Sequence, residues 1–407
     1  MKRLLVFFLL LTSGTAVFSQ QFETQKSDLP EFEKLKVKVG GDFAIQYQGL
    51  DHSTDNDTIA LYDLVSNINL PTANLNLDVL LADGVQMHLR TYLSARHHNE
   101  AWVKGGYVKI DKLDFISQGF LSGLMNVTTL KFGLDEINYG DAHFRRTDNA
   151  YALNNPFVGN YIMDAFTTEA FGEVLIQTSG FIGMIGISNG KLNQNVTVTN
   201  RYNYDNKISF YGKLGYDKQF TDDFRGRLTG SWYLNQGTST GTYLYSGDRA
   251  GSRYYSVMVI DGAADNFTSG RFNPGFTQIT SVQINPFIKF KGLEFFGIYE
   301  MAMGGEKDNN GSYTQLAADL LYRFGGKEQF YAGGRYNLVT GTQTSDSEDI
   351  KIDRINIGGG WFLTENIVVK AEYVTQKYAG DGIVAKLGPV YKGGAFNGFM
   401  LEAAISF

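Results

Sequence analysis

The chain has 407 residues and a formal net charge of −6 at pH 7. A mildly acidic balance argues against nucleic acid as a partner, because nucleic-acid-binding domains carry basic patches. The chain has no cysteine, which excludes thiol nucleophiles, thiolate metal sites and thiol redox motifs. Its 47 glycines, 24 tyrosines and 30 phenylalanines against 6 prolines are typical of an aromatic-rich protein built from strands in curved, closed sheets.

The first 19 residues are predicted to be a signal peptide. Lys2 and Arg3 precede an apolar run from Leu4 to Leu11 that is too short to span a bilayer. Val17-Phe18-Ser19 then offers the small-residue pattern of a signal-peptidase site, so we expect cleavage after Ser19. The alternative is a buried N-terminal helix. Export would leave a mature chain with a formal charge of −8, because Lys2 and Arg3 are removed.

Residues 20–34 are assigned to a polar periplasmic segment, and alternating strand-like segments follow it. An apolar residue at every second position places one hydrophobic stripe on a single face of a strand. The sixteen expected strands span residues 35–48, 73–82, 84–96, 105–115, 127–139, 167–178, 180–189, 206–219, 223–236, 276–291, 293–304, 313–325, 328–341, 350–363, 366–379 and 394–407.

The connections between these strands alternate between tight turns and longer polar segments. Outer-membrane barrels have short periplasmic turns, long outer loops and an even number of strands. The stretch from Arg253 to Ile260 also resembles a strand, but it would make the number odd. We therefore place it inside one long outer loop. Within that loop it could form part of a hairpin that extends above the membrane.

The expected fold is all-β: a transmembrane antiparallel up-and-down β-barrel of 16 strands at residues 35–407, with both termini in the periplasm. A soluble β-sandwich or β-helix is the alternative. Strands of ten to fourteen residues are long for a sandwich, where about five or six is usual. No short repeat period indicates a solenoid.

The alternation of charged and apolar residues predicts which face of each strand contacts water. In residues 224–235, Leu228 and Trp232 oppose Arg225 and Arg227. Because a cation facing lipid at mid-membrane costs about 2–4 kcal/mol, the charged face must be the interior. A barrel of this size with a polar interior encloses a water-filled channel. The cations expected to line the pore are His88, Arg90, Lys109, Lys131, Lys213, Arg225, Arg227, Lys289, Arg323, Arg335, Arg354 and Lys370.

Acidic residues share the inferred lumen face. They are Asp78, Asp111, Asp135, Glu173, Glu300, Asp319, Glu372 and Glu402. Rings of charge set ion selectivity in narrow passages. The alternative is that opposite charges neutralise one another as cross-strand pairs. Aromatic residues near the proposed periplasmic turns are consistent with an interfacial girdle, namely Phe220, Phe290, Tyr322, Phe324, Trp361 and Phe362.

The chain ends in an alternating strand that closes on an aromatic residue. Phe399, Leu401, Ala403, Ile405 and Phe407 share one face. This ending resembles the closing strand of bacterial outer-membrane barrels. The resemblance implies that Phe399, Leu401, Ile405 and Phe407 belong to the signal read by the barrel-insertion machinery.

The signal peptide, the strand count and Phe407 together resemble the bacterial porins. Leu130-Lys131-Phe132-Gly133, just before a long loop, resembles the fifth-strand region of the phosphate-selective porin family. The arginine ladder of that family has no residue-by-residue match here, so phosphate specificity is not carried over. In many porins an early long loop folds into the lumen. If residues 140–166 do so, the pair Arg145 and Arg146 would form a constriction that attracts anions.

No motif for catalysis or cofactor binding is present, so we expect neither an enzyme nor a cofactor. His97 and His98 with Glu100 could bind a metal, but adjacent residues on a strand point in opposite directions, so a solvated loop is the preferred interpretation.

The protein is predicted to be a porin that allows passive diffusion of small hydrophilic solutes. The alternative is a non-conducting structural or adhesin-type barrel. A plugged transporter or receptor is disfavoured, because residues 20–34 are short and polar. A homotrimer in outer-membrane lipid remains open.

Overall fold

The computed structural model describes residues 20–24, 32–68, 71–94, 100–146, 151–191, 207–237, 244–246, 255–263, 269–306 and 309–407. The predicted signal peptide and the pair His97 and His98 lie outside these ranges. The strands are β1 Lys36–Ser53, β2 Asn67–Ile68, β3 Thr72–Ala82, β4 Val85–Ser94, β5 Glu100–Ile110, β6 Thr128–Glu136, β7 Thr168–Thr178, β8 Phe181–Ser188, β9 Ser209–Thr221, β10 Phe224–Asn235, β11 Gln278–Phe290, β12 Leu293–Glu306, β13 Asn309–Phe324, β14 Phe330–Thr342, β15 Ile350–Thr364, β16 Ile367–Ala379 and β17 Ala395–Ser406.

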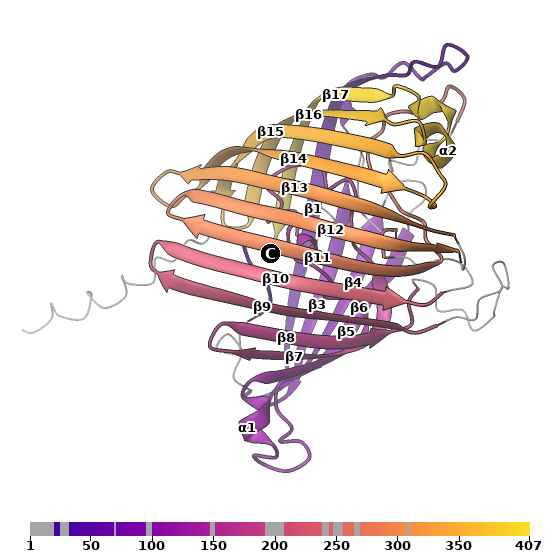
Figure 1. The fold of residues 1–407 in the computed structure, drawn as a ribbon. Coiled ribbons are helices and arrows are strands. Elements are labelled where there is room, and N and C mark those ends of the chain that lie inside the picture. Colours follow the sequence, from indigo (N-terminus) through magenta and orange to yellow (C-terminus); the bar gives the residue numbers. More distant parts are fainter. Residues whose placement is uncertain are drawn as a thin grey trace, which may run out of the picture.

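The strands form one closed antiparallel sheet (Figure 1). Each long strand pairs with its neighbours along the chain, and β17 returns to β1 over twelve residue pairs, from Asp42 opposite Ser406 to Ser53 opposite Ala395. Closure removes the free edges that an open sheet of this size would expose. The predicted up-and-down barrel is confirmed.

The two-residue strand β2 is a continuation of β3. Ala44 of β1 pairs with Thr72 of β3, and Tyr47 of β1 pairs with Ile68 of β2. Strands β2 and β3 therefore follow one another along the same edge of β1. Pro71 lies between them and has no N–H to donate to the ladder. The barrel consequently has the sixteen strands that the sequence predicts.

One expected strand assignment is shifted along the chain relative to the structure. The fourth expected strand, at 105–115, corresponds to β5 and spans Glu100–Ile110. Residues 111–127 instead form a turn-side connection that contains the short helix α1, Ser122–Met125. Leu113, Phe115 and Ile116 continue the apolar character of the strand beyond its end, which explains the shifted boundary. Helix α2, Ile383–Leu387, lies in a connection at the opposite end of the barrel (Figure 1).

The stretch at 253–260 is not a barrel strand, as parity predicted, because β10 pairs directly with β11. Its described part forms an antiparallel bridge between Tyr255 and Ser269, as a hairpin would, but it packs against the barrel and does not stand clear of it. Tyr255 and Val257 are fully buried, and Tyr255 packs against Phe396 of β17 with ring centroids 5.0 Å apart. The loop folds inward because these apolar side chains find partners inside the barrel.

Alternation along each strand separates an apolar exterior from a polar interior. In β13, Leu316 and Leu320 are exposed outward, whereas Gln315 and Asp319 are buried inside. An aromatic row crosses the exterior near the tight turns, with Tyr322, Phe324, Phe330 and Trp361 stacked at centroid distances of 6.4, 5.7 and 5.7 Å. The girdle prediction is wrong for Phe362, which is buried against Tyr331.

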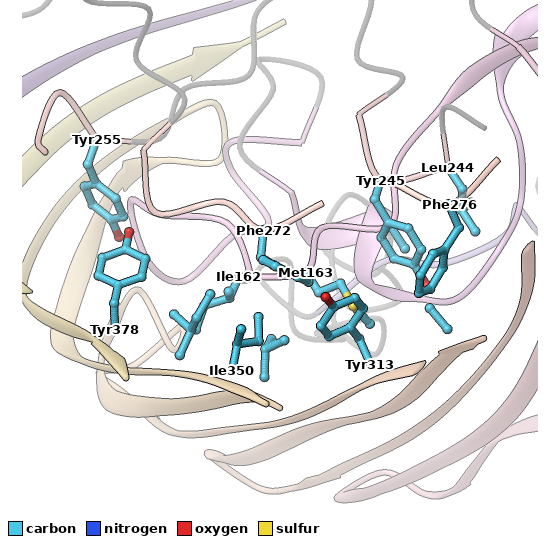
Figure 2. Packing of buried hydrophobic residues seen from close by; sticks show 14 of the residues in the cluster. Ile162, Met163, Leu244, Tyr245, Tyr255, Phe272, Phe276, Tyr313, Ile350 and Tyr378 are labelled. Carbon is cyan, nitrogen blue, oxygen red and sulfur yellow. The ribbon is translucent and has the colours of Figure 1, made fainter. Parts of the chain in front are cut away.

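Part of the interior is apolar, which the expectation of a purely polar lumen missed. Figure 2 shows Ile162 and Phe272, from two long connections, lying against Ile350 and Tyr313 of the wall. All four side chains are fully buried or nearly so. The loops thus carry a hydrophobic cluster into the barrel and narrow the lumen. Among the described residues, no helix has the length and apolarity needed to cross a membrane.

Candidate functional site in the barrel lumen

The predicted pore-lining cations are buried or partly buried on the inner face, and most have a carboxylate partner. His88 Nδ1 lies 2.7 Å from Asp78, and Arg323 Nε lies 2.8 Å from Glu294. Further ion pairs join cations to carboxylates on the same strand, on a nearby strand or on a turn: Arg90–Asp135, Lys109–Asp111, Lys131–Glu173, Arg225–Asp217, Lys289–Glu328, Arg335–Asp319 and Lys370–Glu402. These contacts support the interpretation that opposite charges on the wall neutralise one another.

Arg354 of β15 differs from the others because its hydrogen bonds go to neutral oxygens. Its guanidinium donates to Gln376 Oε1 at 2.6 Å, to Asn160 O at 2.5 Å and to Gly270 O. The side chain is fully buried and lies over the ring of Tyr255. Glu372 is near enough to interact electrostatically. Arg354 therefore binds both long loops to the wall.

The connection between β6 and β7 folds into the lumen, as the porin resemblance implied. We call its described residues, 137–146 and 151–167, the inward loop. Backbone amides of Val158 and Ile162 donate to the wall side chains Glu372 and Asn337, at 2.9 and 2.7 Å. These partners are 214 and 175 positions away in the sequence. Buried backbone groups require partners, and the wall supplies them.

The two arginines of the inward loop are paired. Arg145 lies in the short 3₁₀-helix Ala142–Arg145, and its Nη2 lies 3.5 Å from Glu294 and 3.2 Å from Asp319. Arg146 Nε donates to both carboxylate oxygens of Asp164 in the same loop, at 3.1 and 2.8 Å. Both arginines are almost completely buried. Their charges are therefore compensated locally, so neither stands as a bare cation in a constriction.

A denser cluster of charges surrounds Lys213 of β9 and Arg227 of β10. Asp141 of the inward loop pairs with both, and Arg227 binds it through two nitrogens at 2.7 and 2.8 Å. Burial alone would raise the pKa of Asp141, but Arg227 and Lys213 hold that pKa well below its usual range. Lys213 Nζ also donates to Asn138 Oδ1 and to Gly140 O. The cluster fixes the start of the inward loop to the wall.

Residues 20–24 lie inside the barrel, although residues 20–34 were expected to be a periplasmic segment. Gln20 Nε2 donates to Phe144 O at 3.0 Å, and Phe22 packs edge-on against Phe144 and Phe287. Glu23 reaches Lys213 and Arg227. Sequence reasoning missed this segment because no strand, helix or turn pattern marks it, and Glu23 is its only ionisable residue.

Comparison with known proteins identifies the fold. No protein-family model and no curated protein sequence matches the chain. OmpT, an outer membrane protein of Vibrio cholerae, matches at 10% identity with a TM-score of 0.53, covering 93% of this chain and 100% of that one. An anion-selective porin from Comamonas acidovorans matches at 11% identity and a TM-score of 0.51, covering 92% and 100%. OmpF of Salmonella typhi matches at 12% identity and a TM-score of 0.51, covering 91% and 97%.

The fold is the sixteen-strand barrel of bacterial porins. At these identities the likeness concerns the fold alone. The predicted insertion-signal residues Phe399, Leu401, Ile405 and Phe407 are exposed on the outer face of the barrel. Phe407 also exchanges two backbone hydrogen bonds with Gly41 of β1, which places the last residue at the closing seam.

Proposed function

We propose that this protein is an outer-membrane porin that allows passive diffusion of small hydrophilic solutes. One observation carries the proposal: a closed barrel with an apolar outside and ionised groups inside. Leu316 and Leu320 point outward from β13, whereas Asp319 between them points inward and binds Arg335. This arrangement suits hydrocarbon outside and water inside, because lipid-facing charges are costly.

The cell outer membrane is the proposed location. The aromatic row at the tight-turn end supports it, since aromatic girdles lie at both interfaces of such barrels. The predicted signal peptide and the outward-facing C-terminal aromatics fit export followed by insertion. Cell fractionation with the full chain, and with Phe407 deleted, tests this location.

We further propose a weak anion preference. Most wall cations are paired, so a strong preference is not expected. Arg354 supports this weak preference, because its hydrogen bonds go to neutral oxygens and Glu372 opposes its charge only through space, without a direct ion pair among the described contacts. The similar structure from Comamonas acidovorans is described as anion-selective. Phosphate belongs among the anions to be tested, given the resemblance of Leu130–Gly133 to the phosphate-selective porins.

We also propose that the protein is a homotrimer. One form of the similar Vibrio cholerae OmpT is described as a trimer. Molar-mass measurement by light scattering in detergent distinguishes a trimer from a monomer of this 45.3 kDa chain.

Reconstitution tests the channel directly. The folded protein should conduct in planar bilayers, and liposomes containing it should swell in small sugars faster than in large ones. Reversal potentials in a salt gradient then report the anion preference. A protein that is folded, as judged by heat-modifiable migration on a gel, but does not conduct would favour the structural or adhesin-type barrel instead.

A further inference from the structure

The N-terminal segment, residues 20–24, places the carboxylate of Glu23 against cations of the lumen wall. Glu23 Oε1 lies 3.0 Å from Lys213 Nζ, and Glu23 Oε2 lies 2.8 Å from Arg227 Nη1. Asn138 Nδ2 also donates to Glu23 Oε1, at 3.3 Å. Lys213 and Arg227 are nearly completely buried, and both belong to the wall. A carboxylate held by an ammonium, a guanidinium and an amide occupies a preformed anion site.

The charge balance of this site depends on Glu23. We call Lys213, Arg225 and Arg227 the cation cluster. Within contact distance, two carboxylates of the wall and inward loop oppose it, Asp217 and Asp141. Glu23 provides the third negative charge. Without Glu23, three cations would face two anions, and the site would carry one net positive charge.

The N-terminal segment is attached to the lumen by side chains and not by strand pairing. Phe22 packs against Phe144 and Phe287 with ring centroids 5.7 and 5.3 Å apart. The guanidinium groups of Arg225 and Arg227 lie 5.2 and 4.2 Å from the centre of the Phe22 ring. Arg225 Nη1 donates to Gln20 O at 2.9 Å. A segment held in this way can leave without breaking the hydrogen-bond ladder of the barrel.

We propose that the N-terminal segment is a tethered occupant of an anion site in the lumen, and that solutes bearing a carboxylate displace Glu23 from the cation cluster during passage. The inference rests on the proposed porin function and deepens it by naming a solute class. The solute carboxylate would take the place of the Glu23 carboxylate between Lys213 and Arg227. The covalent link to β1 keeps the segment close, so that it returns when the solute leaves.

Glu23→Gln is the first test, with Glu33→Gln as the matched control. Glu33 is 76% exposed at its side chain and pairs with Lys36, outside the cation cluster. We expect Glu23→Gln to shift the reversal potential in a KCl gradient toward anions. We also expect succinate to inhibit the chloride current at a concentration about tenfold lower than for the wild type, because it no longer competes with a charged partner. Glu33→Gln should behave as the wild type.

Glu23→Cys provides a second test that is independent of the first variant's folding. The chain has no cysteine, so the introduced thiol is the single labelling site. After reconstitution, an anionic thiosulfonate reagent should restore the wild-type reversal potential, and a cationic reagent of similar size should shift it further toward anions. Faster labelling by an uncharged thiosulfonate reagent when voltage drives succinate through the channel would report displacement of the segment, because voltage does not act on that reagent.

The outcomes separate this inference from the proposed function. If the wild type does not conduct, the porin proposal fails. If the wild type conducts but Glu23→Gln has unchanged selectivity and succinate inhibition, the segment is a fixed part of the wall and the inference is overturned. A folded Glu23→Cys variant that resists labelling at every voltage overturns it as well.

Discussion

Asp141 and Arg227 form the firmest link between the inward loop and the barrel wall. Arg227 Nε and Nη2 donate to the two carboxylate oxygens of Asp141, at 2.7 and 2.8 Å, and both side chains are fully buried. Thr229 Oγ1 donates to the same carboxylate at 2.7 Å. A bidentate pair at a loop's first turn determines where the rest of the loop lies, here inside the lumen.

Replacing Asp141 by Asn should loosen the inward loop. The change leaves Lys213 and Arg227 short of one buried counter-charge, and breaking such a pair costs about 3–5 kcal/mol. We expect a lower unfolding midpoint in urea and a larger, noisier single-channel conductance. Asp222→Asn, in an exposed turn, is the control and should change neither quantity. An unchanged conductance would show that the loop stays in place without this pair.

Replacing Arg145 by Gln should move ion selectivity toward cations. Glu294 keeps Arg323 as a partner and Asp319 keeps Arg335, so the barrel should still fold. The lumen nevertheless loses one positive charge. The reversal potential in a KCl gradient measures the shift. Lys112→Gln removes an equal charge from an exposed turn and should have little effect. If both variants behave alike, Arg145 does not face the ion path.

The effect of the Glu23 charge on ion selectivity should persist to low pH. Burial alone would raise the pKa of Glu23, but Arg227 and Lys213 lower that pKa to about 2. A depressed pKa means that the charged contact is fully formed above the ordinary value of about 4.3 and is lost only as pH falls toward 2. The difference in reversal potential between the wild type and Glu23→Gln should therefore be constant from pH 7 to about pH 4. A loss of the difference centred on pH 4 to 5 would contradict the buried ion pair.

Replacing Gly40 by Ala should interfere with closure of the barrel. A Cβ at Gly40 would lie 2.8 Å from the carbonyl oxygen of Phe407, a backbone atom that can move only with the seam. We expect destabilisation of about 1–3 kcal/mol, as for other overpacked sites. The midpoint of heat modification on a gel measures it. Gly123→Ala, whose Cβ would meet nothing within 4 Å, is the control. Equal midpoints would show that the seam tolerates the methyl group.

Replacing Leu316 by Arg should test the hydrocarbon contact. Leu316 lies midway along β13 and is 47% exposed outward. An arginine at the bilayer midplane of a barrel costs about 2–4 kcal/mol. We expect the free energy of unfolding in lipid vesicles to decrease by about this amount. Val65→Arg, at a position 80% exposed in an outer connection, should cost far less. Equal effects would argue against a bilayer around β13.

The local pattern was sufficient for the fold. Strand number, strand order and the inward direction of Arg227 follow from a period of two residues and from the cost of placing charge in lipid, which each strand carries by itself. The bounds of β5 and the position of Phe362 were misassigned because apolar residues continue past a strand end and aromatic residues suit either face.

The contents of the lumen depended on tertiary structure. Glu23 and Asp141 meet Lys213 across sequence separations of 190 and 72 residues, and Val158 meets Glu372 across 214. No local period encodes such contacts, because they arise when buried polar groups of one segment find partners on another. The sequence by itself therefore determined a barrel with a charged interior. Only the three-dimensional packing decided that most of these charges are paired and that loops and the N-terminal segment bind to the inner wall.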